Sequence, residues 1–113
     1  MFVRANSGGG GGSKCASGYY ASGVPSSITT TDITTGESFK PTKLIISCRY
    51  VTNNMLTQIY DASVTPNPVT YRYNTTQSQE RLPVSTGIKA ITTTGFTLNT
   101  NSSMTEFTYM AIG

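Results

Sequence analysis

The chain has few of the side chains that usually perform catalysis or bind metal ions. It has no histidine, which is the commonest general base and a frequent metal ligand. Its two cysteines alone cannot form a four-ligand zinc site. Five carboxylates remain, and we expect them in turns and at strand ends as solvated surface charges: Asp32, Glu37, Asp61, Glu80 and Glu106. The sequence therefore predicts no catalytic residue, no metal site, no cofactor and no enzymatic activity.

Aromatic and cationic residues offer a different chemistry, the binding of carbohydrate. Aromatic rings stack on sugars, and asparagine, threonine and arginine side chains supply directional hydrogen bonds. The candidate saccharide-binding residues are Tyr71, Arg72 and Tyr73, together with Asp61 at the start of the loop of residues 61–68. Tyrosines also pack in protein cores with their hydroxyl groups at the rim. Because the chain has four phenylalanines and no tryptophan, the core needs some of the tyrosines, and both interpretations remain open.

A glycine-rich segment precedes the rest of the chain and could serve as a tether. Residues 1–13 form a separate unit, in which a short apolar head is followed by a flexible run of glycines at 8–12. Phe2, Val3 and Arg4 of the head are candidates for an assembly anchor that adds to a sheet or pocket of a neighbouring subunit. The alternative is that the glycine run is an engineered linker.

The elements that must position these residues are β-strands. Charged residues make up 12% of the chain, about half the usual share, and Thr, Ser, Asn and Gly take their place. Short apolar runs recur about every 8–12 residues between turn residues, and the clearest of them is at 44–51. The sequence therefore predicts one all-β domain at residues 14–113. We expect an antiparallel β-sandwich of about eight short strands, with an extended glycine-rich N-terminal arm.

The last eight residues predict a strand inside the sheet. Residues 106–113 alternate in the manner of a strand, and both alternating sets contain large apolar side chains. Chain ends are usually polar and poorly ordered unless a sheet holds them. A strand with two apolar faces is typical of a buried position. We expect this segment to be an interior strand that is covered on both faces.

The two cysteines could be free or bridged. Cys48 alternates with Leu44 and Ile46, so we expect its side chain to face the core. Nothing in its spacing from Cys15 requires a disulfide, and a buried free thiol and a disulfide both remain open.

The charge and hydropathy of the chain exclude several classes of partner. The net charge of +3 comes from basic residues that are scattered singly, whereas nucleic-acid-binding proteins cluster them on one face. No apolar stretch approaches the about 18 residues that a membrane span needs. The amino-terminal residues also lack the apolar run of a secretory signal. We expect a soluble protein that binds no nucleic acid, does not insert into membranes and has no ordinary cleaved signal.

Three short motifs carry a resemblance to a known family: Phe-Lys-Pro-Thr-Lys before an aliphatic strand at residues 39–46, Gly-Phe-Thr-Leu at 95–98 and Tyr-Met-Ala-Ile-Gly at 109–113. With the glycine-rich segment ahead of them, these motifs resemble small β-rich structural proteins of tailed bacteriophages. The resemblance covers residues 14–113. It implies a virion component, such as a tail, baseplate or fibre-tip domain or a capsid decoration protein, and it identifies no binding residue.

The resemblance also implies partners and a location. Other virion proteins and further copies of the same chain would be the partners, in a homo-oligomer or on a repeating lattice. The protein would be assembled in the host cytoplasm and would reside in the virion. Each N-terminal arm would anchor one copy while its domain projects outward, so that many weak contacts act together. The alternative function is a host-recognition module that binds cell-surface saccharide.

Overall fold

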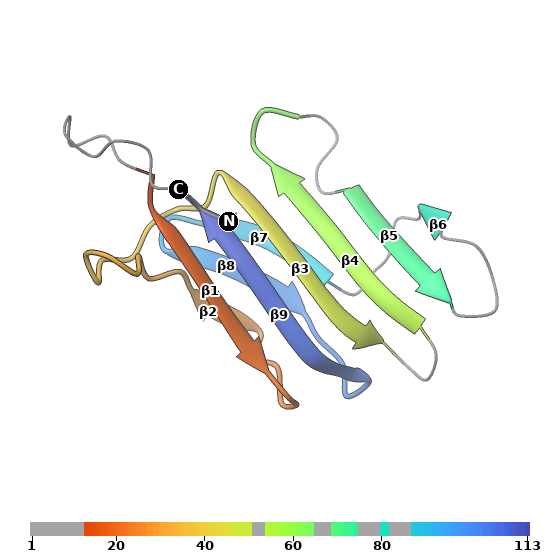
Figure 1. The fold of residues 1–113 in the computed structure, drawn as a ribbon. Helices are drawn as coiled ribbons and strands as arrows, with labels where there is room; N and C mark the ends of the chain where they lie inside the picture. Colours follow the sequence, from red (N-terminus) through yellow and green to blue (C-terminus); the bar gives the residue numbers. More distant parts are fainter. Residues whose placement is uncertain (1–12, 51–53, 65–68, 75–79, 82–86) are drawn as a thin grey trace.

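The protein folds into two antiparallel β-sheets that lie one over the other. The structure, a computed structural model, describes residues 13–50, 54–64, 69–74, 80–81 and 87–113. These described residues form nine strands, of which two are very short, and they contain no helix. The expected fold class, an all-β antiparallel sandwich, is confirmed (Figure 1).

The larger sheet combines strands from both ends of the described chain. Its order is β1-β9-β3-β4-β5-β6, and all neighbours are antiparallel (Figure 1). Its strands are β1 (Cys15–Tyr20), β3 (Lys43–Tyr50), β4 (Asn54–Asp61), β5 (Val69–Asn74), β6 (Glu80–Arg81) and β9 (Met104–Ile112). Strands β3 and β4, which are consecutive in the chain, are antiparallel neighbours.

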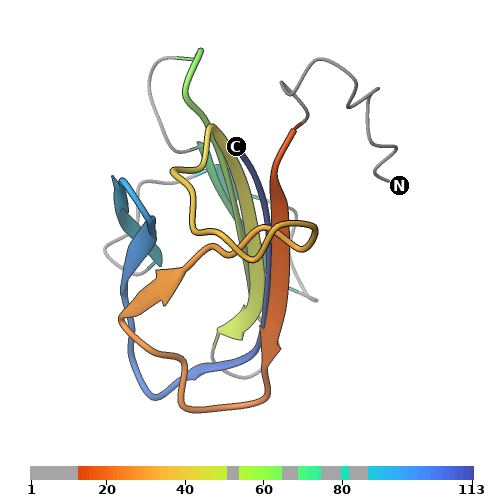
Figure 2. The ribbon, with the colours of Figure 1, turned by 90° about the vertical axis from the view of Figure 1, so that its left-hand side faces the viewer.

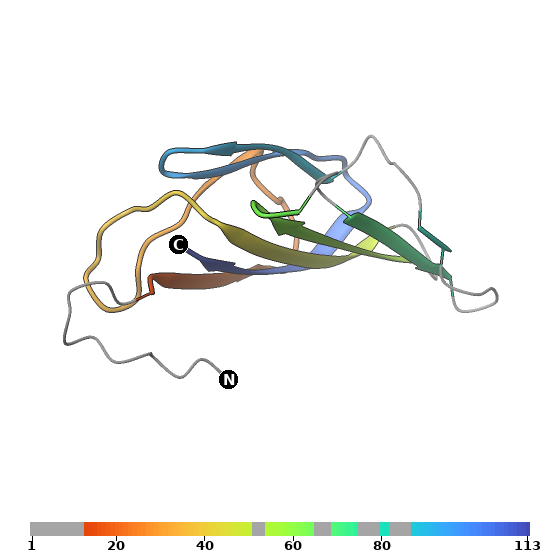
Figure 3. The ribbon, with the colours of Figure 1, turned by 90° about the horizontal axis from the view of Figure 1, so that it is seen from above.

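The smaller sheet covers one face of the larger one. Its order is β2-β8-β7, with β2 at Ser27–Thr29, β7 at Gly87–Thr92 and β8 at Gly95–Asn99. Viewed from the side and from above, this sheet lies over β1, β9, β3 and β4 (Figure 2, Figure 3). No described strand lies over the opposite face of the larger sheet (Figure 2). We call that opposite side the outer face.

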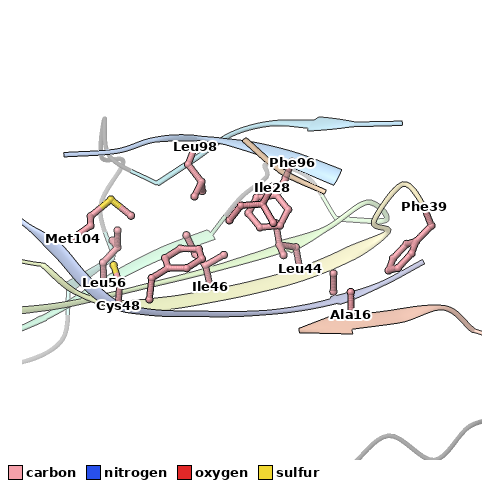
Figure 4. Packing of buried hydrophobic residues seen from close by; sticks show 12 residues of the cluster. Ala16, Ile28, Phe39, Leu44, Ile46, Cys48, Leu56, Phe96, Leu98 and Met104 are labelled. Carbon is pink, nitrogen blue, oxygen red and sulfur yellow. The ribbon is translucent and has the colours of Figure 1, made fainter. Parts of the chain in front are cut away.

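The hydrophobic core lies between the two sheets (Figure 4). On β3, the alternation predicted from the sequence is confirmed, because Leu44, Ile46 and Cys48 are buried while Ile45 and Arg49 are exposed. The fully buried large apolar residues come from β3, β4, β8 and β9: Leu44, Ile46, Leu56, Phe96, Met104 and Phe107. Burying each such side chain contributes about 1.5–3 kcal/mol, so this layer is the main source of stability.

The C-terminal strand β9 is an interior strand of the sheet, as predicted. It lies between β1 and β3, and its end is held further by hydrogen bonds from Gly113 N to Lys14 O at 2.8 Å and from Thr42 N to Ile112 O at 2.7 Å. The expectation that both faces of β9 are covered is wrong. The inner face is buried, but Met110 on the outer face is 44% exposed, because the smaller sheet covers one side only.

The two cysteines are free, and the interpretation of Cys48 as a buried thiol is confirmed. Cys48 is 1% exposed, and this burial raises the pKa of its thiol to about 11. Cys15 lies on β1, and strand β9 separates it from β3. The side chains of Cys48 and of Ala16, the residue after Cys15 on β1, face the core, whereas Cys15 alternates with Ala16 and belongs to the other face.

A β-bulge at Glu106 changes which residues of β9 face inward. Ser47 pairs with Thr108 and Arg49 pairs with Thr105, so that β9 has one extra residue at this point. Glu106 has a φ of 51°, the left-handed conformation that glycine adopts most readily. Because of the extra residue, Met104 and Phe107 are both buried although they are an odd number of residues apart.

We predict that the Glu106→Gly variant will be more stable than the Glu106→Val variant. Glycine removes a left-handed strain of about 1–2 kcal/mol, while the exposed ion pair with Arg49 that it loses contributes only about 0–1 kcal/mol. Valine loses the same ion pair and is disfavoured by its β-branch. Chemical denaturation should show the glycine variant to be at least as stable as the wild type and about 1–2 kcal/mol more stable than the valine variant. Equal stability of the two variants would contradict this account of the bulge.

Candidate functional site

The outer face of the larger sheet carries a row of apolar side chains in register. Met110 of β9 pairs with Ile45 of β3, and Ile45 pairs with Ile59 of β4. Directly paired residues in antiparallel strands point to the same side of a sheet. All three side chains are between 41% and 44% exposed. This row crosses the middle of the sheet at right angles to the strands.

Two further exposed apolar residues lie on the same face outside this row. Tyr19 of β1 is 60% exposed and pairs with Thr108, and Met55 of β4 is 44% exposed and pairs with Arg49. Tyr19 is in the same row as the hydroxyl side chains of Thr108, Ser47 and Thr57, and this polar row separates Met55 from the apolar row. Ser47 and Thr57 approach to 3.3 Å. We call the following five residues the outer-face patch: Tyr19, Ile45, Met55, Ile59 and Met110. Soluble monomers rarely expose several large apolar side chains together on one face. The patch is therefore a candidate contact surface.

Charged side chains near the patch lie at its two ends and form oppositely charged pairs. At one end, the Lys43 ammonium lies 3.8 Å from the Asp61 carboxylate, and at the other end the Arg49 guanidinium lies 3.4 Å from the Glu106 carboxylate. Such exposed pairs add little to stability. They do leave each end of the patch without net charge from these four residues.

Asp61, one of the predicted saccharide-binding residues, is held by its own loop. Its carboxylate accepts hydrogen bonds from the Ser63 amide at 2.9 Å and the Ser63 hydroxyl at 2.7 Å. These two hydrogen bonds, and then the charge of Lys43, hold the pKa of Asp61 below its ordinary value. Asp61 therefore serves at least as a turn-stabilising residue at the end of β4.

The other predicted saccharide-binding residues lie on β5, whose side chains are outside the described part of the structure. The backbone register pairs Tyr71 with Thr57 and Tyr73 with Met55, which are both positions of the outer face. Arg72 pairs with Leu56 of the inner face. The fold therefore brings positions 71 and 73 to one side of the sheet and places position 72 on the other.

Some of the described tyrosines pack against the core. Tyr20, Tyr60 and Tyr109 are partly buried and pack against the core, as the core interpretation predicts. The ring of Tyr109 meets Phe96 edge-on, with a centroid separation of 5.3 Å, and burial and the nearby Tyr20 raise the pKa of its hydroxyl group. Tyr19, by contrast, is exposed on the outer face, which the sequence patterns did not single out.

Asp32 differs from the prediction that all carboxylates are solvated surface charges. It is 4% exposed, and its carboxylate accepts hydrogen bonds from the Cys15 amide at 3.2 Å and from the Thr35 hydroxyl at 2.8 Å. Burial raises the pKa of Asp32, but these hydrogen bonds outweigh it and leave the pKa below its ordinary value. Asp32 thus joins the loop after β2 to the start of β1. Local sequence patterns do not reveal this structural role, because Cys15 and Asp32 are far apart in the sequence.

The predicted assembly anchor, Phe2, Val3 and Arg4, lies outside the described residues. Near the start of the described chain, the Lys14 amide donates a hydrogen bond to Gly113 O at 3.4 Å. Within the described ranges, no three His, Cys, Asp or Glu side chains lie close enough together to hold a metal ion. Nor does any helix of the described residues have the length and apolar character needed to cross a membrane.

Comparison of the chain with protein-family models, with curated proteins and with solved structures finds no match in any of the three. The resemblance of its short motifs to phage structural proteins therefore stays a prediction. The outer-face patch, with the positions of Tyr71 and Tyr73 at its edge, is the surface on which a function can be argued.

Proposed function

We propose that the chain is a structural protein of a bacteriophage virion, a small β-domain displayed on the particle and anchored by its N-terminal arm. Its place would be the tail, baseplate, fibre or capsid surface. Its partners would be other virion proteins and copies of itself, and no nucleic acid or membrane. It would be assembled in the host cytoplasm and act without enzymatic activity.

One observation carries the proposal: the compact domain begins and ends at the same place. Gly113 N donates to Lys14 O, so the end of β9 and the start of β1 are joined. Residues 1–12 precede this joined pair and include the apolar head and the glycine run. A peptide that leaves a domain at such a closed corner can bind elsewhere without opening the fold.

The residues of the phage-like motifs support the proposal because they determine the fold. Phe39 is buried and contacts Gly113, so that the first and last motifs meet. Gly95 allows β8 to approach β2 closely, since a Cβ at this position would lie 2.9 Å from Thr29 Cα and would overlap the Ile28 carbonyl oxygen. Motifs that specify a stable domain and leave its surface free to vary suit a displayed structural protein.

The arm should be required for incorporation into particles. In phage particles produced with a variant as the only copy, deletion of residues 1–12 or the double change Phe2→Ser and Val3→Ser should reduce incorporation at least about tenfold, because the apolar anchor is lost. The matched control is Ser7→Thr, which leaves the apolar head and the glycine run in place. The measurement is the amount of the chain in purified particles. Unchanged incorporation of the deletion variant would defeat the anchoring role.

The second candidate function is a host-recognition module that binds cell-surface saccharide. The observation that favours it is the backbone register, which puts positions 71 and 73 on the exposed side of the sheet beside Thr57 and Met55. Two aromatic residues at alternate positions of a strand suit the stacking of a sugar ring. Asp61 lies on the same side at the far end of β4, where it pairs with Lys43.

Saccharide binding predicts a clear difference between tyrosines. On an array of host cell-wall polysaccharides, the wild type should bind, and Tyr71→Ala and Tyr73→Ala should each weaken binding by about tenfold or more, in line with the loss of about 1–3 kcal/mol of stacking per ring. Tyr19→Ala is the matched control, because Tyr19 is an exposed tyrosine on a different strand. A wild type that binds nothing on the array would remove this candidate.

A further inference from the structure

We infer that the outer-face patch is the interface of a homodimer, in which the larger sheets of two copies pack face to face. The inference rests on the proposed function, in which several copies assemble, and makes that assembly more specific. It adds the surface, the partner and the symmetry of one contact. The partner is a second copy of this chain.

The first argument is that the patch is apolar and uncovered. Its five side chains are between 41% and 60% exposed, on strands that the smaller sheet covers only from the other side. Four of them come from the long strands β3, β4 and β9, which lie next to each other in the middle of the sheet. Met110, Ile45 and Ile59 are directly paired across these three strands, and the hydroxyl row separates Met55 from them. Exposed apolar residues that are contiguous across several strands mark interaction surfaces more often than scattered ones do.

The second argument is that the patch suits a two-fold axis. Strand β3 has two strands on either side of it in the order β1-β9-β3-β4-β5. Ile45 of β3 has Met110 on one side and Ile59 on the other in the same row. A two-fold axis that passes beside Ile45 would place this row against the same row of the second copy, as an isologous interface requires. Two such sheets would pack about 10 Å apart, as in a β-sandwich.

The third argument is the area of the face. With strands about 4.8 Å apart and a rise of about 3.3 Å per residue, the five strands from β1 to β5 present about 24 Å by 23 Å, or roughly 550 Å² per copy. Two copies would bury about 1,100 Å² in total, which exceeds the about 1,000 Å² that a specific interface needs. The face just clears this minimum and is slightly smaller than the about 1,200–2,000 Å² that stable interfaces usually bury.

The fourth argument is electrostatic. The charges of β3, β4 and β9 on this face are the pairs Lys43–Asp61 and Arg49–Glu106, which lie at opposite ends of the patch. Each end therefore holds one cation and one anion. Whichever way the second copy is turned by the two-fold axis, neither end meets a block of like charge.

The N-terminal arm is a poorer occupant of the patch than a second copy. Residues 1–12 contain only three large apolar side chains, Met1, Phe2 and Val3, and five of the twelve are glycine. Such a peptide has too little apolar surface to cover five strands, and ordering its glycines would cost much conformational entropy.

Sedimentation analysis of the purified full chain over a range of concentrations tests the inference. The wild type should be a dimer at about 100 μM. Ile45→Lys should raise its dissociation constant by about 100-fold or more, because each dimer would bury two lysine charges. Ala90→Lys is the matched control: Ala90 is exposed on β7 of the smaller sheet, so this variant should stay dimeric. Met110→Lys serves as a second variant of the patch, and circular dichroism checks that each variant is folded.

Three results would overturn the inference: a monomeric wild type, a dimer that Ile45→Lys and Met110→Lys leave intact, or a dimer that becomes monomeric when residues 1–12 are deleted. In the last case the arm would be the link between copies. The deletion variant should instead remain dimeric. Because this experiment uses isolated protein and incorporation into particles is measured separately, either proposal can fail without the other.

Discussion

The pairing of β9 between β1 and β3 is the interaction on which the rest of this structure depends. Without β9, strand β1 would have no neighbour in the sheet, and the order of the larger sheet would begin at β3. The same strand supplies Met104, Phe107 and Ala111 to the core. The residue after β9 is held as well, through hydrogen bonds between Gly113 and Lys14. The fold is therefore complete only when its C-terminal residues are in place. The pairing of β9 with β1 is also non-local, because the two strands are far apart in the sequence.

Much of the fold could be predicted from the sequence because local alternation and turn residues decide it. Strands β3 and β4 and the terminal strand follow from period-two patterns that are long enough to be unambiguous. The bulge at Glu106 could not be predicted, since the φ of 51° arises from pairing with β3 and no glycine marks the position. The buried Asp32 was missed for a similar reason: its partner Cys15 is far away in the sequence.

The candidate site shows where sequence patterns reach their limit. Apolar residues on both sides of residues 106–113 indicate that both faces avoid water, but they cannot tell what covers each face. In the structure the smaller sheet covers the inner face, and Met110 and Ile45 on the outer face are exposed. A second copy and a saccharide at Tyr71 and Tyr73 would compete for parts of this surface, because Tyr73 pairs with Met55 of the patch. The proposed dimer contact and the proposed saccharide site therefore concern the same face of the sheet and differ in what occupies it.

Hydrogen exchange at the backbone amides of β9, measured by NMR on the wild-type chain, tests the central pairing most directly. Interior strands of a sheet open only with global unfolding, whereas free chain ends exchange at once. The amides of residues 107–112 should therefore be among the slowest in the protein, as slow as those of β3. Rapid exchange of residues 107–112, with slow exchange retained in β3 and β4, would show that the chain closes its sheet in some other way and would contradict the account.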